Sequence, residues 1–226
     1  MQLTRRDYLG WLGGVFAALL NIPAALGAQL KNFSGLMVRR GDGDFELWRQ
    51  SMVWYLHKPR RYPDLIARAK TSADVVAAVD YARDAGLKIA TRATGHNPAR
   101  GCLREGGLLL DTSQLRAAQI DAAEGTAWVE PGLRSEEFIE LTRAQGWSFP
   151  AAHTGIVGLG GYLLGGGLGW NMPAWDMACR SIIAADIVLA DGRLVRATPE
   201  QNADLLWAVR GCGPGFFGIV VRYQLR

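Results

Sequence analysis

The chain has 226 residues, of which 49% are apolar and 20% charged, with a formal net charge of +4. This length suits one large domain or two small ones with a real core, and the scattered basic residues form no stripe with interleaved aromatics, which argues against nucleic-acid binding. The three cysteines have no CxxC spacing, so a zinc or thioredoxin-like site is not supported and no metal is expected.

The first 27 residues predict an export signal. Arg5 and Arg6 precede an apolar run that is too short to span a bilayer, and Ala25-Leu26-Gly27 offers small residues for a signal peptidase. The paired arginines resemble the twin-arginine type, which predicts a periplasmic or secreted protein with no integral membrane segment after cleavage. The alternative is a buried or membrane-anchoring N-terminal helix.

Residues 28–55 lack clean periodicity, apart from a turn signal at "GDGD", and are interpreted as a leader or linker before a domain at 56–226. Thr71 or Ser72 is expected to cap the first helix of this domain, and Gly86 to end it. The predicted buried face of that helix consists of Val75, Val76, Val79 and Ala82. Short strands are then expected at "LKIAT" and "GGLLLDTS".

The second half of the domain predicts two hairpins, two helices and a last strand. One hairpin turns at Glu124-Gly125 and the other at Asp191-Gly192. Ser135 is expected to cap a helix that ends at Gly146, and Thr198 one that ends at Gly211, with "GIVVRYQLR" as the final strand. Helices and strands mix without strict βαβ alternation, so the predicted class is α+β.

Glycine is the clear compositional excess, with 28 residues. Many lie in "HTGIVGLGGYLLGGGLGW", residues 153–170, where they would either let backbone approach an anionic ligand or form tight packing turns. A Walker A loop is absent, and the GxGxxG in "RGCGPGFFGIV" follows a predicted helix and precedes a strand, the reverse of the dinucleotide fingerprint. A phosphate-rich ligand is expected, but not on a Rossmann unit.

Six collinear segments carry a resemblance to a known family. They are "RATGH", Gly132, the 153–170 motif, "ADIVLADGRLVRA", "NADLLWAVRG" and "GFFGIV". Together they resemble the PCMH-type FAD-binding domain of the vanillyl-alcohol oxidase superfamily, nearest to berberine-bridge-enzyme-like oxidoreductases, from about Pro59 to Arg226. The resemblance implies two small α/β subdomains with FAD between them.

The resemblance also implies the cofactor contacts. The loop after the strand would wrap the FAD pyrophosphate with backbone N–H groups, and His96 stands where the family often bonds the flavin covalently. The alternatives for His96 are a hydrogen bond to the flavin region or no ligand role. The implied FAD-binding residues are Arg92, Ala93, Thr94, Gly95, His96, Asn97, Gly132, Thr154, Gly155, Val157, Gly158, Gly160, Gly161, Gly165, Gly166, Gly167, Leu168, Gly169, Val188, Gly218 and Ile219.

Several positions depart from the family pattern. Thr94 replaces a glycine of R-x-G-G-H, and Thr154 stands where some members bond the flavin through cysteine, so at most one covalent bond is expected. Tyr162 follows GxGG and would either face the flavin or pack as a structural tyrosine. Arg180 stands where Asp is common, and would pair with the pyrophosphate or with a surface carboxylate. The cysteines match no attachment position; they are expected to be small buried side chains, or to include one disulfide.

The resemblance also implies a substrate domain that usually supplies the catalytic base, and we expect this chain to lack that domain. The first expectation is therefore an exported FAD-dependent oxidase or dehydrogenase of a small alcohol, sugar or amine, shortened after its FAD domain. The second is a flavin-binding module without catalysis, or a half that needs a partner chain. The third is a glycine-rich structural domain without flavin.

Overall fold

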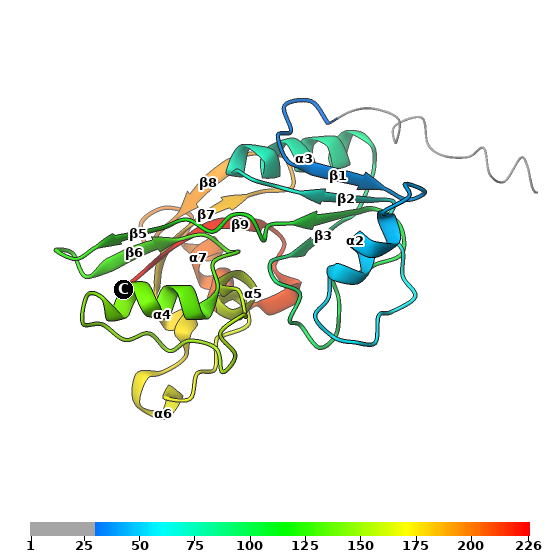
Figure 1. The fold of residues 1–226 in the computed structure, drawn as a ribbon. Coiled ribbons are helices and arrows are strands. Elements are labelled where there is room, and N and C mark those ends of the chain that lie inside the picture. Colours follow the sequence, from blue (N-terminus) through cyan, green and yellow to red (C-terminus); the bar gives the residue numbers. More distant parts are fainter. Residues whose placement is uncertain (1–29) are drawn as a thin grey trace, which may run out of the picture. The chain divides into compact units, whose positions relative to one another are not determined.

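The computed structural model describes residues 30–226, and the predicted export signal lies outside them. The unit Lys31–Arg226 contains two lobes, each built on one β-sheet (Figure 1). The first sheet has the strand order β1-β2-β4-β3 and the second the order β5-β6-β9-β7-β8. Helices and strands are mixed in the α+β manner that the sequence predicted.

The first lobe combines parallel and antiparallel pairing. Its strands are β1 (Leu36–Arg39), β2 (Leu65–Arg68), β3 (Ile89–Arg92) and β4 (Leu108–Asp111). Strand β1 runs antiparallel to β2, whereas β2 and β3 both run parallel to β4. All four residues of β4 are buried, because helices cover both faces of the sheet (Figure 1).

Helix α3 (Ser72–Asp84) covers one face of this sheet and α2 (Phe45–Ser51) the other. The predicted cap of α3 is confirmed: the Thr71 hydroxyl accepts from the Asp74 N–H at 3.1 Å, and the Asp74 carboxylate accepts from the Thr71 N–H at 3.0 Å. Gly86 ends it with φ +65°, the left-handed conformation expected there. Ala78 rather than Val76 completes the buried face, since Val76 is only half-buried.

The interpretation of residues 28–55 as a leader is wrong for the part that the structure describes. Strand β1 adds to the first sheet, and α2 packs on it with Phe45, Met52 and Val53 all buried. The pattern was missed because both elements are short, and a strand of four residues gives too few alternations to recognise. The turn predicted at "GDGD" is present between them.

The second lobe is an antiparallel sheet of five strands. These are β5 (Ala118–Asp121), β6 (Thr126–Val129), β7 (Ile182–Val188), β8 (Leu194–Ala197) and β9 (Ile219–Leu225). Both predicted hairpins are confirmed, with Gly125 and Gly192 at positive φ in their turns. Tyr223 of β9 is fully buried, and its hydroxyl donates to the Gly160 carbonyl at 3.1 Å. This bond ties the glycine-rich segment to the sheet.

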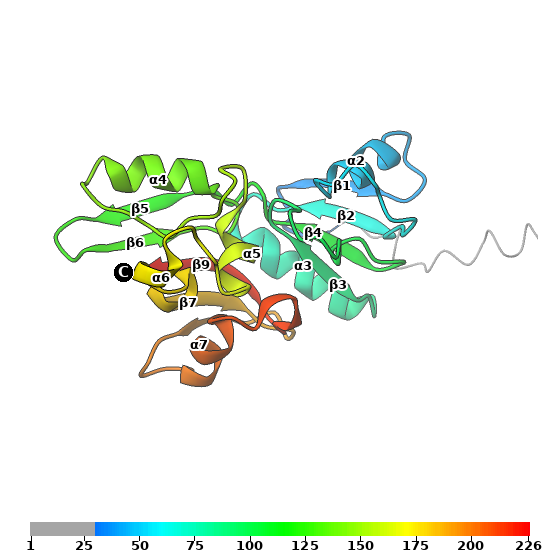
Figure 2. The same cartoon turned by 90° about the horizontal axis from the view of Figure 1, so that it is seen from below.

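The helices of this lobe gather on one side of the sheet (Figure 2). They are α4 (Ser135–Arg143), α5 (Leu159–Leu164), α6 (Met172–Trp175) and α7 (Ala203–Val209), with 3-10 turns η2 (Ala178–Ser181) and η3 (Gly213–Gly215). Leu159, Leu163 and Phe138 are buried in one cluster with the inward residues of β7 and β9. Seen from below, α5 lies on the side of its lobe that faces the first lobe.

Two predicted helix starts in this lobe are wrong. Arg134, not Ser135, occupies the cap of α4, and the Ser135 hydroxyl donates instead to the Val157 carbonyl at 3.0 Å. Helix α7 begins at Ala203 because the Thr198 hydroxyl accepts from the N–H groups of Glu200 and Gln201. Thr198 thus closes a local turn, the competing use of a capping residue.

The three cysteines are free thiols. Cys179 is buried as expected and Cys102 half-buried, but Cys212 is exposed, contrary to the prediction of small buried side chains. Among the residues described, no helix is long and apolar enough to cross a membrane, and no cluster of side chains could hold a metal ion.

Candidate functional site

The two segments singled out in the sequence meet where the lobes touch. The Thr94 hydroxyl, in the loop after β3, accepts a hydrogen bond from the Gly158 N–H at 2.7 Å. A Cβ on Gly158 would lie 2.8 Å from Thr94 Cγ2, so the glycine permits this approach. Thr94 stands where the family has a glycine. It therefore fastens the loop of residues 93–107, called the His96 loop below, to the glycine-rich segment of residues 153–170.

The loop after β3 has four successive N–H groups without a partner in the part of the chain that the structure describes. Within residues 30–226, the backbone N–H groups of Thr94, Gly95, His96 and Asn97 donate to no protein acceptor. Consecutive free N–H groups of this kind can bind anionic oxygens without any cationic side chain. The Asn97 side chain is occupied locally, since its oxygen accepts from the Ala99 N–H at 2.9 Å.

Arg92, at the end of β3, supports this loop from behind. Its Nη1 donates to Asp111 Oδ1 at 2.6 Å, and its Nε donates to the Met52 carbonyl at 2.9 Å. Asp111 is fully buried and also accepts from Arg68 Nε at 2.7 Å. Arg92 is therefore held in a structural ion pair. This fixes the point at which the loop begins at Ala93.

His96 is half-buried beside an aromatic ring. Its imidazole stacks on Trp54, with ring centroids 5.2 Å apart and planes 24° apart. Burial lowers the pKa of His96, and the nearby positive charges of Arg92 and Arg134 lower it further. The neutral imidazole is therefore favoured, and this is the form that can act as a nucleophile.

Most of the site glycines fit against protein rather than against open space. An added Cβ would meet Ser113 at Gly132, Glu136 at Gly155, Pro131 at Gly160, Ala178 at Gly167 and the Pro150 carbonyl at Gly169. Gly161, on the first turn of α5, differs because no atom of residues 30–226 lies within 4 Å of its added Cβ. Gly161 is the position of this segment with clear room for a ligand.

The remaining predicted contacts spread over the same lobe. Thr154 and Leu168 are exposed, Gly165 ends α5, and the carbonyls of Val157 and Gly166 accept backbone bonds from Ser135 and Cys179. Val188 is buried and pairs with Ile219 in the β7–β9 ladder, where Gly218 precedes Ile219. Their part in binding the cofactor stays a prediction.

The structure shows the contacts of Tyr162 and Arg180, for which the sequence left two alternatives each. The Tyr162 hydroxyl donates to the Pro150 carbonyl at 2.6 Å, and burial raises the pKa of Tyr162 to about 12, so this phenol packs as a structural tyrosine. Arg180 Nε lies 3.7 Å from Asp176 Oδ2, and both side chains are exposed. Its observed neighbour is thus a surface carboxylate.

Trp54, Met52 and Asp111 are the residues that sequence reasoning missed. Met52 and Trp54 lie in the segment interpreted as a linker, and Asp111 lies inside the predicted strand "GGLLLDTS" without a role of its own. The signal that could have found Asp111 is a carboxylate directly after three buried leucines, since a buried charge needs a partner.

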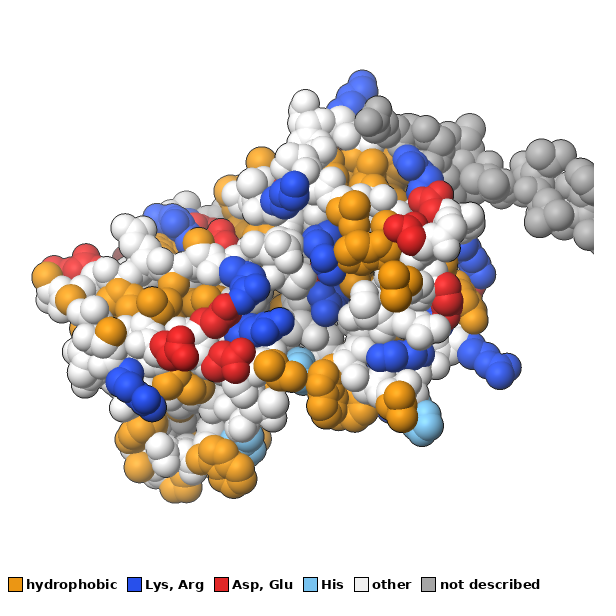
Figure 3. Space-filling view, in the orientation of Figure 1, with side chains coloured by type: hydrophobic (Ala, Val, Ile, Leu, Met, Phe, Trp, Pro, Cys, Tyr) orange, Lys and Arg blue, Asp and Glu red, His pale blue; other side chains and the backbone are white. Residues whose placement is uncertain are grey.

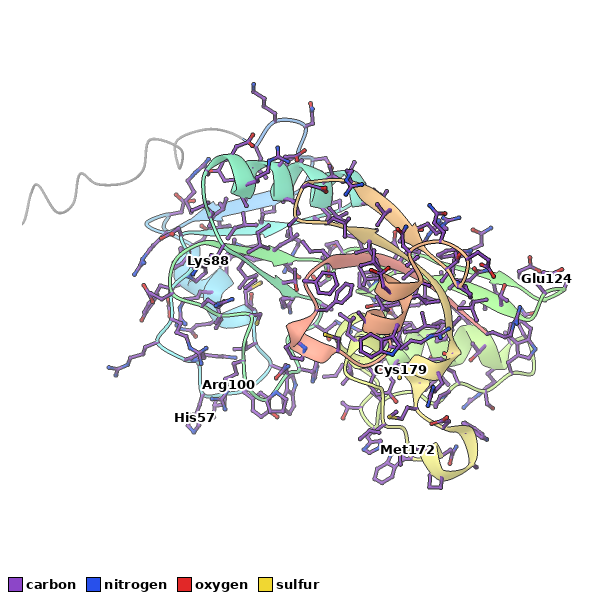
Figure 4. All side chains as sticks on the ribbon, turned by 180° about the vertical axis from the view of Figure 1, so that it is seen from behind. His57, Lys88, Arg100, Glu124, Met172 and Cys179 are labelled. Atoms are coloured by element: carbon purple, nitrogen blue, oxygen red, sulfur yellow. The ribbon has the colours of Figure 1, made fainter. Side chains whose placement is uncertain are left out.

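The surface of the unit Lys31–Arg226 is notched between the lobes. The space-filling view shows hydrophobic and histidine side chains on the rim of this notch (Figure 3). Seen from behind, Arg100 at the tip of the first lobe and Met172 at the tip of the second lie on its two sides (Figure 4). The notch is the place where a ligand could touch both the His96 loop and α5.

Comparison with known proteins supports the resemblance to an FAD-binding domain over most of the chain. A family model described as "FAD binding domain" matches residues 63–198. FAD-linked oxidoreductase janO of Penicillium janthinellum is 36% identical over 182 residues, which are 80% of this chain and 40% of that protein.

Two solved structures are similar in fold as well as sequence. The 6-hydroxy-D-nicotine oxidase of Arthrobacter nicotinovorans superimposes with a TM-score of 0.80 at 30% identity, over 88% of this chain and 43% of that one. Glucooligosaccharide oxidase of Acremonium strictum, described with a 6-S-cysteinyl, 8α-N1-histidyl FAD, gives a TM-score of 0.79 at 26% identity, over 89% and 42%. The chain thus spans about 40% of the length of the relatives it matches.

Proposed function

The chain belongs to the FAD binding domain family, and we propose that it holds FAD in the notch between its lobes as the flavin-binding part of an exported oxidoreductase. The observation that carries the proposal is the run of four N–H groups at Thr94–Asn97, which donate to no acceptor in the described part of the chain and which Thr94 fastens to the glycine-rich segment. These N–H groups suit the pyrophosphate, and the open side of Gly161 lets a ligand approach α5. The residues present therefore fit the group.

FAD would supply a two-electron redox centre, and the chain's residues would bind and orient it. The loop N–H groups would hydrogen-bond the phosphate oxygens in place of a cationic side chain, because Arg92 is already paired with Asp111. His96, favoured as the neutral imidazole, would be the point of covalent attachment. Thr154 offers no thiol, so a single covalent bond is proposed.

The substrate would be a small alcohol, sugar or amine, a range that the relatives' oligosaccharide and hydroxynicotine substrates support. Because the chain spans about 40% of those relatives, the substrate contacts and the catalytic base would come from a further domain, in the same polypeptide or in a partner chain. The same coverage supports the second candidate, a flavin-binding half that is inactive alone. The paired Arg5-Arg6 support export by the twin-arginine route.

An absorbance spectrum before and after acid precipitation tests the proposal. Yellow flavin in the pellet, lost in His96→Ala but kept in His57→Ala, is the expected result. If the wild type released its flavin to the supernatant, FAD binding would be supported but the covalent bond would be excluded. A chain that stays colourless after incubation with excess FAD would contradict the proposal as a whole.

A further inference from the structure

The segment Met52–Trp54 is fastened to the His96 loop at several points. The Trp54 N–H donates to the Gly95 carbonyl at 3.1 Å, and the Met52 carbonyl accepts from Arg92 Nε at 2.9 Å. A Cβ on Gly95 would lie 2.3 Å from the Met52 carbonyl oxygen, so the two backbones are in contact. The loop that bears His96 is therefore shaped against this segment as well as by β3.

Side chains of the two segments also contact one another at this place. The His96 ring stacks on Trp54, Trp54 meets the ring of Tyr55 edge-on at 5.3 Å, and the Arg100 guanidinium lies 5.1 Å from the centre of the Tyr55 ring. His96 and Arg100 belong to one loop, and Trp54 and Tyr55 to the other segment. Trp54 and Tyr55 thus each contact two of these neighbours, and the stacking on Trp54 restricts rotation of the imidazole.

Burial in the core does not explain why residue 54 is a tryptophan. Met52 and Val53 are almost fully buried, whereas Trp54 is 57% exposed. The Trp54 ring lies outside the core and stacks on the His96 imidazole. Because the Trp54 N–H already fixes the backbone, a smaller side chain would suffice for the fold alone.

We propose that Trp54 is the positioning residue for His96, holding the imidazole in the orientation from which it bonds FAD. This inference rests on the proposed function. In the attachment, one imidazole nitrogen bonds the 8α carbon of the flavin; the methyl group and the imidazole N–H each lose one hydrogen. These two protons and two electrons go to dioxygen, which becomes hydrogen peroxide. A free imidazole would rarely face that carbon, and orientation contributes strongly to the rate of such a step.

The direct test follows acid-stable flavin after FAD is added to flavin-free chain. In Trp54→Ala the rate of formation should fall about tenfold or more, as expected when a reacting group loses its orientation. Trp54→Phe, which can still stack, should recover most of the wild-type rate. Trp207→Ala is the matched control, because Trp207 on α7 is 80% exposed and stacks on no ring among the described residues.

FAD affinity and thermal unfolding of the same variants separate orientation from folding. Trp54→Ala should retain reversible FAD binding within about twofold and unfold as cooperatively as the wild type, because Trp54 itself is largely exposed. An unchanged rate of attachment in Trp54→Ala, or an equal loss in Trp54→Phe, would overturn the proposal.

A readout without FAD keeps this inference distinct from the proposed function. Stacking on an indole shifts the His96 ring protons upfield in an NMR spectrum, and the shift should disappear in Trp54→Ala but persist in Trp207→Ala. Its absence from the wild type would overturn the positioning role even if FAD binds. Conversely, a wild type that shows the shift but binds no FAD would contradict the proposed function, and Trp54 would then have no attachment to position.

Discussion

The His96 loop and the glycine-rich segment 153–170 use glycine in different ways. In the segment, most glycines remove side chains so that the protein can pack against itself, as Gly160 does beneath Pro131 and Gly167 beside Ala178. The stretch Thr94–Asn97 of the loop has one glycine, Gly95, yet it presents four N–H groups that donate to no acceptor within residues 30–226. Unpaired donors therefore identify a ligand site better than glycine density does.

The largest expected effect comes from removing what holds the loop in place. In Asp111→Asn, the guanidinium groups of Arg68 and Arg92 would lose their shared buried carboxylate, and the free energy of unfolding should fall by about 3 kcal/mol. Urea unfolding measures this change. Asp191→Asn, which affects an exposed pair with Arg193, should leave the midpoint almost unchanged. An unaltered midpoint in Asp111→Asn would mean that the loop does not depend on this ion pair.

Gly95→Ala tests the glycine within the stretch Thr94–Asn97. Its φ is +77°, and the new Cβ would lie 2.3 Å from the Met52 carbonyl oxygen. Left-handed backbone alone costs an alanine about 1–2 kcal/mol, so we expect a loss of stability of about 2 kcal/mol or more, together with weaker FAD binding. Thermal unfolding and a fluorescence titration of FAD check the two effects.

Gly161→Ala should give the opposite pattern. No described residue meets its added Cβ, and alanine favours a helix over glycine by about 0.5–1 kcal/mol, so stability should be equal or higher. If the open side of Gly161 faces the cofactor, FAD affinity should nevertheless fall about tenfold, or about 1.4 kcal/mol. Unchanged FAD affinity would remove Gly161 from the predicted contacts and leave the His96 loop as the main site.

Much of the fold could be predicted from local chemistry. The capping box at Thr71, the hairpin glycines and the buried run of β4 each depend on a few neighbouring residues, and each was found. The failures involve competition or distance. Thr198 closes a turn instead of capping a helix, and β1 becomes a strand only because β2 pairs with it. No local pattern reveals such a partner.

The candidate site was predicted less completely, for the same reason. Placing His96 in the loop after β3 needed only the motif, but its neighbour Trp54 lies 42 positions earlier in the chain and was assigned to a linker. For Tyr162 the motif left two alternatives, and the structure supports the structural tyrosine, because its hydroxyl donates to the Pro150 carbonyl. Long-range contacts decide which side chains of a motif reach the ligand.

Asp176 offers a smaller test at the end of the glycine-rich region. Its φ of 62° and ψ of −176° lie in a region that almost only glycine adopts, at a cost of about 1–3 kcal/mol for other residues. Its carboxylate accepts from the Met177 N–H at 2.7 Å, an exposed contact of small value. Asp176→Gly should therefore raise the free energy of unfolding by about 1 kcal/mol. A lower melting temperature would show that the carboxylate contacts outweigh the backbone strain.

The smallest expected effect is the acid sensitivity that the His96 loop gives to the fold. Because burial and the charges of Arg92 and then Arg134 lower the pKa of His96 below its ordinary 6.5, the unfolded chain takes up this proton more readily than the folded chain. The stability linked to His96 is thus fully present above pH 6.5 and is lost as pH falls below that value. Melting temperatures should drop more between neutral and mildly acidic buffer in the wild type than in His96→Gln. Arg134→Gln should show an intermediate drop, because it removes one of the two charges while burial and Arg92 remain. Equal drops in all three chains would mean that His96 protonates as easily in the folded loop as in the unfolded chain, and the bias toward a nucleophilic imidazole would then be absent.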